Sequence, residues 1–283
     1  MMTKSALLEK PPTPQGMIEV RIIQSRPIAN NQWSIWVKPD EAGAIKELPS
    51  FLPGQFCMLS LLDRVDPLIA RPFAIVDQDD GMYQFIYRVH GKLTHQLVKA
   101  SVGSKLGLVG PLGKGIPREH LKKGKHCFIA GGVGYASLMP LIQELVKNKR
   151  EDAGRIFYGV REDLEIIRKI PLAYDIASDD GSAGFHGRLP ELLKKKESDW
   201  KDSDWFYICG PTPMMKAVYD LLPPDRSLYF LEETMGCGFG ICIGCVVPIL
   251  NEKSEVKKVR SCIEGPIFKG EVLKPWKDGA WAL

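Results

Sequence analysis

Four cysteines near the C-terminal end of the chain constrain its fold more than any other feature. Cys237, Cys242 and Cys245 follow a C-x4-C-x2-C spacing, and Cys262 stands alone after a gap of 16 residues. This is the spacing of the plant-type thiolate ligands of a [2Fe–2S] cluster. Three glycines lie between the first three cysteines, and glycine lets a short loop turn its backbone N–H groups towards an anionic centre. The rest of the chain is therefore expected to deliver electrons to this loop or to take them from it.

A zinc site is the alternative for four such cysteines. Zinc motifs favour two C-x2-C pairs, whereas here one pair has four intervening residues and the last cysteine is single. Apolar residues alternate with the cysteines and would keep solvent away from the irons. The spacing favours a [2Fe–2S] cluster over zinc, with four ligands: Cys237, Cys242, Cys245 and Cys262.

Composition limits the class of protein and its partners. The chain has 283 residues, 45% hydrophobic and 25% charged, so it can form two domains and a small third. The net charge of +4 is spread along the sequence, and the basic run at 194–196 is flanked by Glu191 and Glu197. Such a run is typical of a solvated helix face, so we expect no nucleic-acid partner. The other three cysteines lie in apolar segments, which indicates a reducing, cytoplasmic compartment.

No segment predicts membrane insertion. Residues 1–16 contain one short apolar run and three prolines, so we expect an irregular arm and not a signal peptide. The longest uncharged stretch, 126–143, contains three glycines and a proline, which is unsuited to a spanning helix.

The first third of the chain predicts short strands. Apolar, β-branched and aromatic residues alternate with polar ones at 18–23, 34–37, 56–62, 73–76 and 83–89, with proline and glycine between these runs. Several short strands at this spacing indicate a small antiparallel barrel or sandwich.

Two segments of this region have residues suited to binding a phosphorylated heterocycle. In Arg71-Pro72-Phe73-Ala74, the arginine could pair with a phosphate while the ring packs on a planar ligand. In the stretch 87–94, a strand runs into a glycine turn and a helix start. Thr94 would cap that helix, and the N–H groups behind it would bind pyrophosphate. Each segment alone is also compatible with an ordinary strand edge.

The middle third alternates strands and helices. Strands are predicted at 127–130, 156–160, 173–177 and 205–209, and helices at 135–147, 189–195 and 214–221. This alternation indicates a doubly wound parallel sheet covered on both faces. The turn Gly131-Gly132-Val133-Gly134 links the first strand to the first helix, where such sheets hold phosphate. A purely structural tight turn is the alternative. Asp180 lies in a polar loop after a strand, and either binds cofactor or makes the turn.

Taken in order, these motifs resemble the ferredoxin-reductase superfamily, through Arg-x-Tyr/Phe-Ser/Thr, Gly-x-x-Thr and Cys-Gly-Pro-x-x-Met. The resemblance implies FAD and NAD(H) as cofactors, with NADP not excluded. It implies that Arg71 contacts the FAD phosphates and that Pro72, Phe73 and Ala74 line the isoalloxazine or ribityl group. The same resemblance assigns further cofactor-binding residues: Ile86, Tyr87, Arg88, Leu93 and Thr94 to FAD, and Gly131, Gly132, Gly134, Asp180, Cys209, Gly210 and Pro211 to NAD(H).

The chain departs from the superfamily pattern at two positions. Ala74 replaces the usual Ser or Thr, so a side-chain hydrogen bond to flavin N5 is lost. Leu93 stands where a second glycine is common. Arg161 could meet the 2′-phosphate of NADP, but Glu162 and Asp163 beside it would repel that group, so NAD is favoured.

From residue 17 to about 275 the chain is similar to the electron-transfer subunit family of type B dihydroorotate dehydrogenase. The similarity rests on 179–182, 209–211, 232–245 and 262–268. It implies an FAD-binding barrel at 17–118, an NAD-binding α/β domain at 119–227 and a [2Fe–2S] domain at 228–275. Electrons would pass between NAD(H), FAD and the cluster, and then to or from a catalytic subunit in a hetero-oligomer. In the family that subunit binds FMN and oxidises dihydroorotate. Glu233, just before the cluster loop, is expected near the nicotinamide.

Two other functions fit the same motifs. The first is an NAD(P)H-reductase subunit of another complex, such as a sulfide dehydrogenase, a bifurcating transhydrogenase or a soluble hydrogenase. The second is a non-catalytic iron–sulfur redox sensor. Reduction of an artificial acceptor by NADH would separate the enzymes from the sensor.

Overall fold

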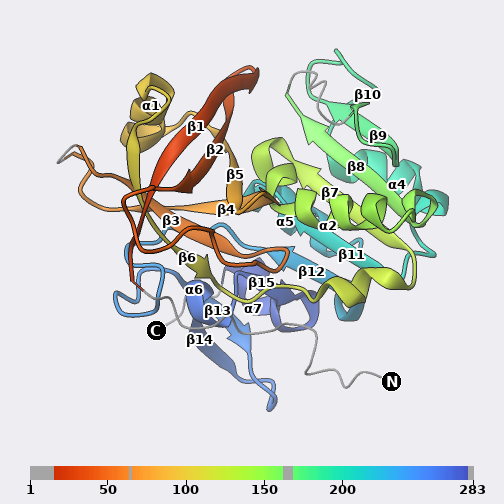
Figure 1. Cartoon of the computed structure of the whole chain (residues 1–283). Coiled ribbons are helices and arrows are strands. Elements are labelled where there is room, and N and C mark those ends of the chain that lie inside the picture. Colours follow the sequence, from red (N-terminus) through yellow and green to blue (C-terminus); the bar gives the residue numbers. More distant parts are fainter. Residues whose placement is uncertain (1–15, 64–65, 162–167, 280–283) are drawn as a thin grey trace.

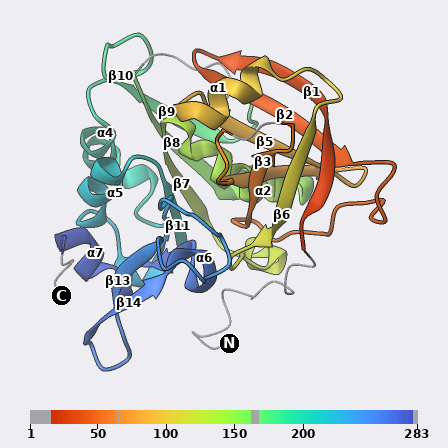
Figure 2. The ribbon, with the colours of Figure 1, turned by 90° about the vertical axis from the view of Figure 1, so that its left-hand side faces the viewer.

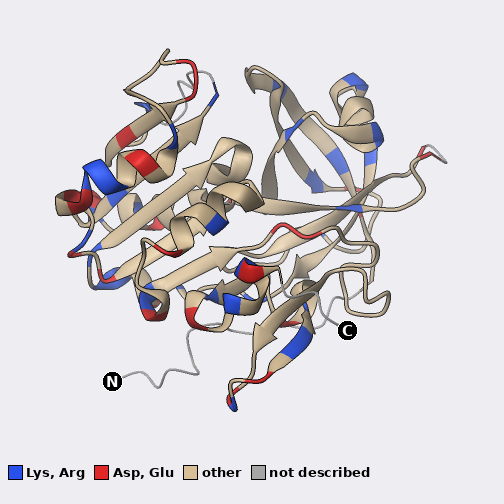
Figure 3. Ribbon diagram, turned by 180° about the vertical axis from the view of Figure 1, so that it is seen from behind, with Lys and Arg blue, Asp and Glu red and all other residues tan. Residues whose placement is uncertain are grey.

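The computed structural model describes residues 16–63, 66–161 and 168–279. The expected irregular arm therefore lies outside the described residues, except for Gly16. No helix in these ranges is long and apolar enough to cross a membrane. Along the ribbon seen from behind, Lys and Arg positions are interspersed with Asp and Glu positions (Figure 3).

The first part of the chain forms a closed antiparallel barrel (Figure 1). Its strand order is β1-β2-β5-β4-β3-β6, and helix α1 (Gly91–Lys99) connects β5 to β6. The strands are β1 Ile18–Ala29, β2 Gln32–Pro39, β3 Phe56–Leu61, β4 Arg71–Asp79, β5 Met82–Arg88 and β6 Lys105–Leu112. The predicted barrel is confirmed.

The barrel closes because alternate side chains of each strand fill its interior. Val20, Ile22, Ile35, Val37 and Phe85 are fully buried there. Pairing of β1 with β6, for example Ile18 opposite Leu108, joins the first strand to the last. No strand edge of the barrel is left open, so the outer face is free to hold ligands and neighbouring segments.

The second part is a seven-stranded sheet in the order β10-β9-β8-β7-β11-β12-β15. All neighbours are parallel except β12 and β15. The strands are β7 His126–Gly131, β8 Gly154–Val160, β9 Ala173–Ser178, β10 Phe185–His186, β11 Trp205–Cys209, β12 Ser227–Phe230 and β15 Ile267–Lys269. The predicted parallel sheet is confirmed, with one antiparallel edge strand.

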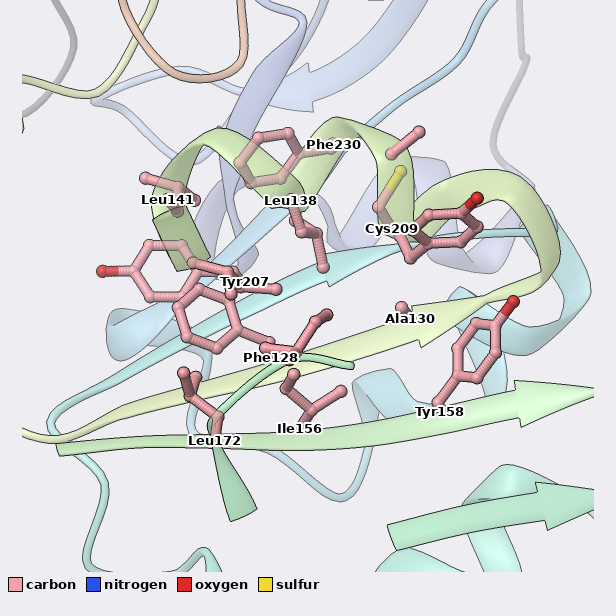
Figure 4. Close-up of a cluster of buried hydrophobic side chains, with 14 of the residues drawn as sticks. Phe128, Ala130, Leu138, Leu141, Ile156, Tyr158, Leu172, Tyr207, Cys209 and Phe230 are labelled. Atoms are coloured by element: carbon pink, nitrogen blue, oxygen red, sulfur yellow. The ribbon is translucent and has the colours of Figure 1, made fainter. Parts of the chain in front are cut away.

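Helices cover both faces of the sheet. They are α2 Tyr135–Lys147 on one face, and α4 Leu189–Lys195 with α5 Thr212–Tyr219 on the other. Figure 4 shows Leu138 and Leu141 of α2 pointing at Phe128, Ile156 and Tyr207 of the strands. Because side chains alternate along a strand, the neighbours of Phe128 on β7 pack on the opposite face.

The C-terminal region holds a hairpin and returns to the sheet. Its elements are β13 Val246–Leu250, β14 Val256–Arg260, α6 Ser261–Glu264, β15 and α7 Lys274–Asp278. Single 3₁₀ turns complete the chain: η1 Arg118–Lys122, η2 Gly132–Gly134, η3 Glu151–Ala153, η4 Glu197–Asp199, η5 Pro224–Arg226 and η6 Gly270–Val272. Strand β12 spans the proposed boundary at 227/228, and β15 pairs with it. The cluster region is thus built onto the edge of the sheet.

The barrel and the sheet pack directly on each other. Val76 and Ile86 of the barrel belong to the same buried cluster as helix α2. Arg118, in the connection, donates from Nη1 to Glu144 Oε2 of α2 at 2.7 Å and from Nη2 to the Phe51 carbonyl at 3.3 Å. These contacts hold the two units at one orientation and shape the space between them.

Candidate functional site

A cavity of about 800 Å³ lies between the barrel and the sheet. It is formed at the carboxyl ends of β7, β8, β9 and β11, where open α/β sheets bind their ligands. The barrel contributes the turn between β1 and β2 and Arg88 at the end of β5. Gln32 Oε1, beside this cavity, is buried and accepts no hydrogen bond within the described residues.

Two glycine turns meet at the floor of the cavity. A Cβ on Gly134 would lie 2.6 Å from the Cys209 carbonyl oxygen, and one on Gly210 would lie 2.9 Å from the Gly131 backbone. Only glycine permits these approaches. Gly132 has φ +54° and open space around it. The turn brings the N-terminus of the 13-residue helix α2 to the cavity, and its N–H groups can bind a phosphate there. The predicted Gly131, Gly132, Gly134, Gly210 and Pro211 all line this cavity.

A carboxyl group that the sequence reasoning missed also lines the cavity. Glu232 follows β12, and its Oε1 accepts hydrogen bonds from Ser137 Oγ at 3.2 Å and Cys209 Sγ at 3.6 Å. Glu232 is open to the cavity. Desolvation by the surrounding protein raises the pKa of its carboxyl, and the two hydrogen bonds oppose that rise.

Glu233, the residue predicted near the nicotinamide, is not among the residues that line the cavity. Its carboxyl accepts a hydrogen bond from the Trp276 side chain, and burial raises its pKa. Successive residues of an extended segment face opposite ways, so a shift of one position separates the two roles. The hydrogen-bonding partner Ser137 lies 95 positions away, and no local motif marks it.

In the polar loop after β9, one aspartate lines the cavity and the other makes a turn. Asp179 lines the cavity together with Arg161 and Arg188. Asp180, the predicted cofactor residue, accepts a hydrogen bond from the Ser182 N–H at 2.9 Å and makes an Asx turn. Asp179 lines the cavity and Asp180 does not, so the cofactor contact of Asp180 stays a prediction. Glu162 and Asp163, on which the preference for NAD depended, lie outside the described residues.

On the barrel, the residues of β4 alternate between the inner and outer faces. Phe73 is buried in the interior, where its ring meets Phe85 and Tyr87 edge-on. It therefore packs inside the barrel, and its contact with the flavin stays a prediction. Its neighbours Pro72 and Ala74 are half-buried on the outer face. Arg71 is exposed at the start of the strand, and its Nη1 donates to the Ile69 and Ala70 carbonyls.

The segment after β5 also differs from expectation in detail. The N-cap of α1 is His90, and Thr94 lies in the first turn. Thr94 Oγ1 accepts from the His90 N–H at 2.7 Å and donates to the His90 carbonyl, so it fastens the turn instead of capping it. Tyr87 and Leu93 are buried in the barrel core. Arg88 reaches the cavity, and Ile86 packs towards the sheet.

The four motif cysteines form two pairs. The Cys242 N–H donates to Cys237 Sγ at 3.5 Å, and the Cys262 N–H donates to Cys245 Sγ at 3.4 Å. Cys245 also hydrogen-bonds the Cys262 thiol. Within the described residues, no three Cys, His, Asp or Glu side chains lie close enough to hold one metal ion. A [2Fe–2S] cluster takes two protein ligands on each of its two irons, and the two hydrogen-bonded cysteine pairs match that arrangement.

The backbone around the first pair favours thiolate. The Ile241 N–H also donates to Cys237 Sγ at 3.3 Å. Burial acts against ionisation of Cys237, but several hydrogen bonds, led by that from Cys242, lower its pKa to about 7. An anionic cluster is stabilised by N–H donors directed at its sulfur ligands. These donors are a second observation, after the pairing of the cysteines, that fits a [2Fe–2S] cluster.

The two pairs differ in exposure. Cys245 and Cys262 are buried against Phe56, Met58 and Leu112 of the barrel. Cys237 is half-buried and Cys242 is exposed. One half of the ligand set therefore faces the barrel, and the other half faces solvent.

The cluster loop, residues 237–245, lies one strand away from the outer face of β4. A Cβ on Gly238 would lie 2.4 Å from Met58 Cγ, so the loop rests on β3. Met58 pairs with Pro72, and Phe56 pairs with Ala74. Adjacent strands are about 4.8 Å apart, which places the outer face of β4 beside the buried cysteine pair. Figures 1 and 2 both show the C-terminal region against the end of β6, the other neighbour of β3.

The solvent side of the cluster loop is apolar. Phe239, Ile241 and Ile243 are 44%, 74% and 65% exposed. Large aliphatic and aromatic side chains grouped on one exposed loop are typical of a protein-binding surface. These three residues are called the loop patch below.

Sequence comparison identifies relatives over most of the chain. A family model for the iron–sulfur cluster binding domain of dihydroorotate dehydrogenase B matches residues 232–274. The dihydroorotate dehydrogenase B (NAD(+)) electron transfer subunit of Desulforamulus reducens is 36% identical over 229 residues, which cover 77% of this chain and 84% of the relative. An electron transfer subunit homolog of the same enzyme from Aquifex aeolicus is 33% identical over 263 residues, covering 90% and 97%.

Solved structures resemble this fold. The NADH-dependent reduced ferredoxin-NADP oxidoreductase structure aligns with a TM-score of 0.69 at 23% identity, covering 89% of this chain and 88% of that one. The ferredoxin reductase in carbazole 1,9a-dioxygenase aligns with a TM-score of 0.63 at 20% identity, covering 75% and 68%. At these identities the likeness establishes the shared fold.

Proposed function

Because the chain belongs to the family of dihydroorotate dehydrogenase B electron transfer subunits, we propose that it passes electrons between NAD(H) and a catalytic partner subunit. Its cofactors are FAD and a [2Fe–2S] cluster in addition to NAD(H). The chain is an oxidoreductase subunit whose organic substrate is handled by the partner. In this family the partner is a dihydroorotate dehydrogenase, as the relatives' names state.

One observation carries this proposal: the three candidate binding regions lie on neighbouring elements of the fold. The cavity borders the barrel at Arg88 and Gln32. The outer face of β4 is one strand away from the buried cysteine pair, and the second pair reaches solvent. A path of this kind suits the transfer of electrons from a dinucleotide to a partner surface, because every step joins neighbouring elements.

At the cavity, the side chains support a bound dinucleotide in one orientation. The N-terminus of α2 would hold the pyrophosphate, and Asp179 would accept a hydrogen bond from a ribose hydroxyl. Glu232 would then lie at the nicotinamide end, beside Gly210, with the buried Cys209 thiol donating to its carboxyl from behind. The hydrogen-bond acceptors of Glu232 suit the carboxamide N–H₂ group.

At the barrel, the outer face of β4 would hold FAD. Arg71 has Nη1 bound to backbone carbonyls, which fixes the guanidinium and leaves its other N–H groups to a phosphate. Pro72 and Ala74 offer an apolar surface for the isoalloxazine ring. When bound, FAD exchanges hydride with NAD(H) and single electrons with the cluster.

At the surface, the four cysteines would hold the cluster. Cys245 and Cys262 would hold it from the side of the barrel, and Cys237 and Cys242 from the side of solvent. The loop patch surrounds the outer pair and would meet the partner. Electrons would leave or enter there.

Anaerobic titration of the purified holoprotein with NADH tests the function. We expect FAD to bleach first and a reduced [2Fe–2S] signal to follow by EPR, with a catalytic subunit of the dihydroorotate dehydrogenase type recovered from the native complex. A different catalytic subunit would assign the chain to another complex. An FAD-free, zinc-loaded monomer that NADH does not reduce would contradict the proposal.

Replacing Glu232 tests the nicotinamide end of the cavity. Glu232→Gln keeps the shape of the side chain but removes its charge and its second acceptor oxygen. Loss of a hydrogen bond to a charged group is worth about 1.5–3 kcal/mol, so we expect FAD reduction by NADH to slow roughly 10- to 100-fold in stopped-flow measurements. Glu233→Gln is the matched control and should remain within about twofold of wild type. Equal rates of FAD reduction in the two variants would show that Glu232 does not contact the nicotinamide.

A further inference from the structure

Arg260 links the two segments that carry the cysteines. Its Nη1 donates to the Gly240 carbonyl at 3.0 Å, within the cluster loop. Its Nη2 lies 3.2 Å from Glu264 Oε1, and its backbone N–H donates to Glu264 Oε2 at 2.8 Å. Glu264 therefore holds the arginine by side chain and main chain together. Arg260 and Glu264 are only 40% and 33% exposed, so water screens this pair incompletely.

The carbonyl that Arg260 holds belongs to a peptide unit that faces a cysteine. The N–H of that same unit is the Ile241 N–H, which donates to Cys237 Sγ at 3.3 Å. A guanidinium on the carbonyl polarises the peptide and strengthens the bond that its N–H makes. Arg260 thus affects a sulfur of the outer pair through the polarisation of one peptide unit.

The preceding N–H of the loop reaches the inner pair. The Gly240 N–H donates to the Cys262 sulfur. Gly240 has φ +88°, and a Cβ there would lie 2.7 Å from Ile263 Cγ1 and 3.4 Å from Arg260 Nη1. Gly240 is therefore clamped between Arg260 and Ile263, with one N–H on each side of it directed at a cysteine sulfur.

We propose that Arg260, held by Glu264, is a positioning residue that sets the reduction potential of the cluster. The inference rests on the proposed function, since it requires the cluster to be bound. Reduction adds one negative charge to a centre that already carries four thiolates. A nearby positive charge and N–H donors to sulfur stabilise the reduced state more than the oxidised state. Arg260 supplies the charge and strengthens the hydrogen bond from the Ile241 N–H to Cys237 Sγ, and Glu264 offsets part of the charge.

EPR-monitored redox titration of the holoprotein tests this assignment. We expect Arg260→Gln to disfavour the reduced cluster about tenfold, a fall of about 59 mV in midpoint potential for one electron. Glu264→Gln removes the offsetting charge and should raise the midpoint. Lys257→Gln, an exposed position on the same strand β14, removes the same charge at a distance from the loop and should leave the midpoint unchanged.

The outcomes separate this inference from the proposed function. A wild-type protein without a reduced [2Fe–2S] signal would refute the function itself. A full iron content in Arg260→Gln with the midpoint of Lys257→Gln would overturn the role of Arg260. If Arg260→Gln retains no iron, Glu264→Gln decides: a raised midpoint supports the proposal, and a midpoint equal to wild type overturns it. Arg260→Lys keeps the charge but not the planar contact with Gly240. A smaller fall in midpoint potential in Arg260→Lys than in Arg260→Gln would show that the charge contributes to the effect.

Discussion

A Cys245→Ser variant should lose the [2Fe–2S] cluster and with it electron transfer to the partner, while NADH continues to reduce FAD. Cys245 is 2% exposed and belongs to the pair that packs against the barrel. A serine hydroxyl is a poor ligand for iron compared with thiolate, and the buried position admits no replacement ligand. We expect iron to fall from about two atoms per chain to near zero, and electron delivery to the partner to fall at least about 100-fold.

The measurements are iron content, the EPR signal and the rate of FAD bleaching by NADH. Cys127→Ala is the matched control, because Cys127 is fully buried in β7 and distant from the cluster loop. It should keep the cluster, with a loss of stability of about 1 kcal/mol from the small cavity. A Cys245→Ser protein with an unaltered [2Fe–2S] spectrum would refute the ligand assignment.

The features that could be predicted from the sequence are those set by neighbours along the chain. The spacing of the first three cysteines identified the cluster motif because thiolate ligands on one loop must follow each other closely. Helices α2 and α4 and strand β11 begin and end at the predicted residues. Their apolar periodicity and their glycine and proline boundaries are local signals.

The features that could not be predicted depend on which face of a strand meets which neighbour. The barrel places Phe73 inside and Ala74 outside, and the motif Arg-Pro-Phe-Ala does not distinguish the two arrangements. Glu232 and Glu233 differ by one position, and only the tertiary packing of Ser137 and Cys209 on one side and Trp276 on the other separates them.

Long-range pairing was also beyond local reasoning. Strand β15 has only three residues, and it joins the sheet as an antiparallel neighbour of β12. Its pairing attaches the segment that follows Cys262 to the nucleotide-binding sheet. The pairing of the cysteines two and two likewise comes from the approach of α6 to the cluster loop, which no spacing reveals.

The loop patch lies on the solvent side of the cluster loop, beside the outer cysteine pair. An exposed isoleucine beside an exposed cysteine has little value for the stability of the isolated chain, since it buries no surface on folding. On association it would bury apolar area and exclude water from the outer cysteine pair. In the proposed complex the patch would therefore connect affinity for the partner with the electron path, because the contact that binds the partner would also shorten the transfer distance.

Ile241→Glu should weaken partner binding at least about tenfold and leave reduction of FAD by NADH unchanged. Ile241 is 74% exposed, so glutamate disturbs no core, but in the complex its charge would be desolvated at the centre of the interface. Titration calorimetry with the catalytic subunit measures the affinity, and bleaching of FAD controls for integrity. Val256→Glu, at a 53% exposed apolar position on the hairpin, is the matched control and should bind as wild type. Equal weakening by both variants would move the docking surface away from the loop patch, and no weakening by either would exclude the patch from the interface.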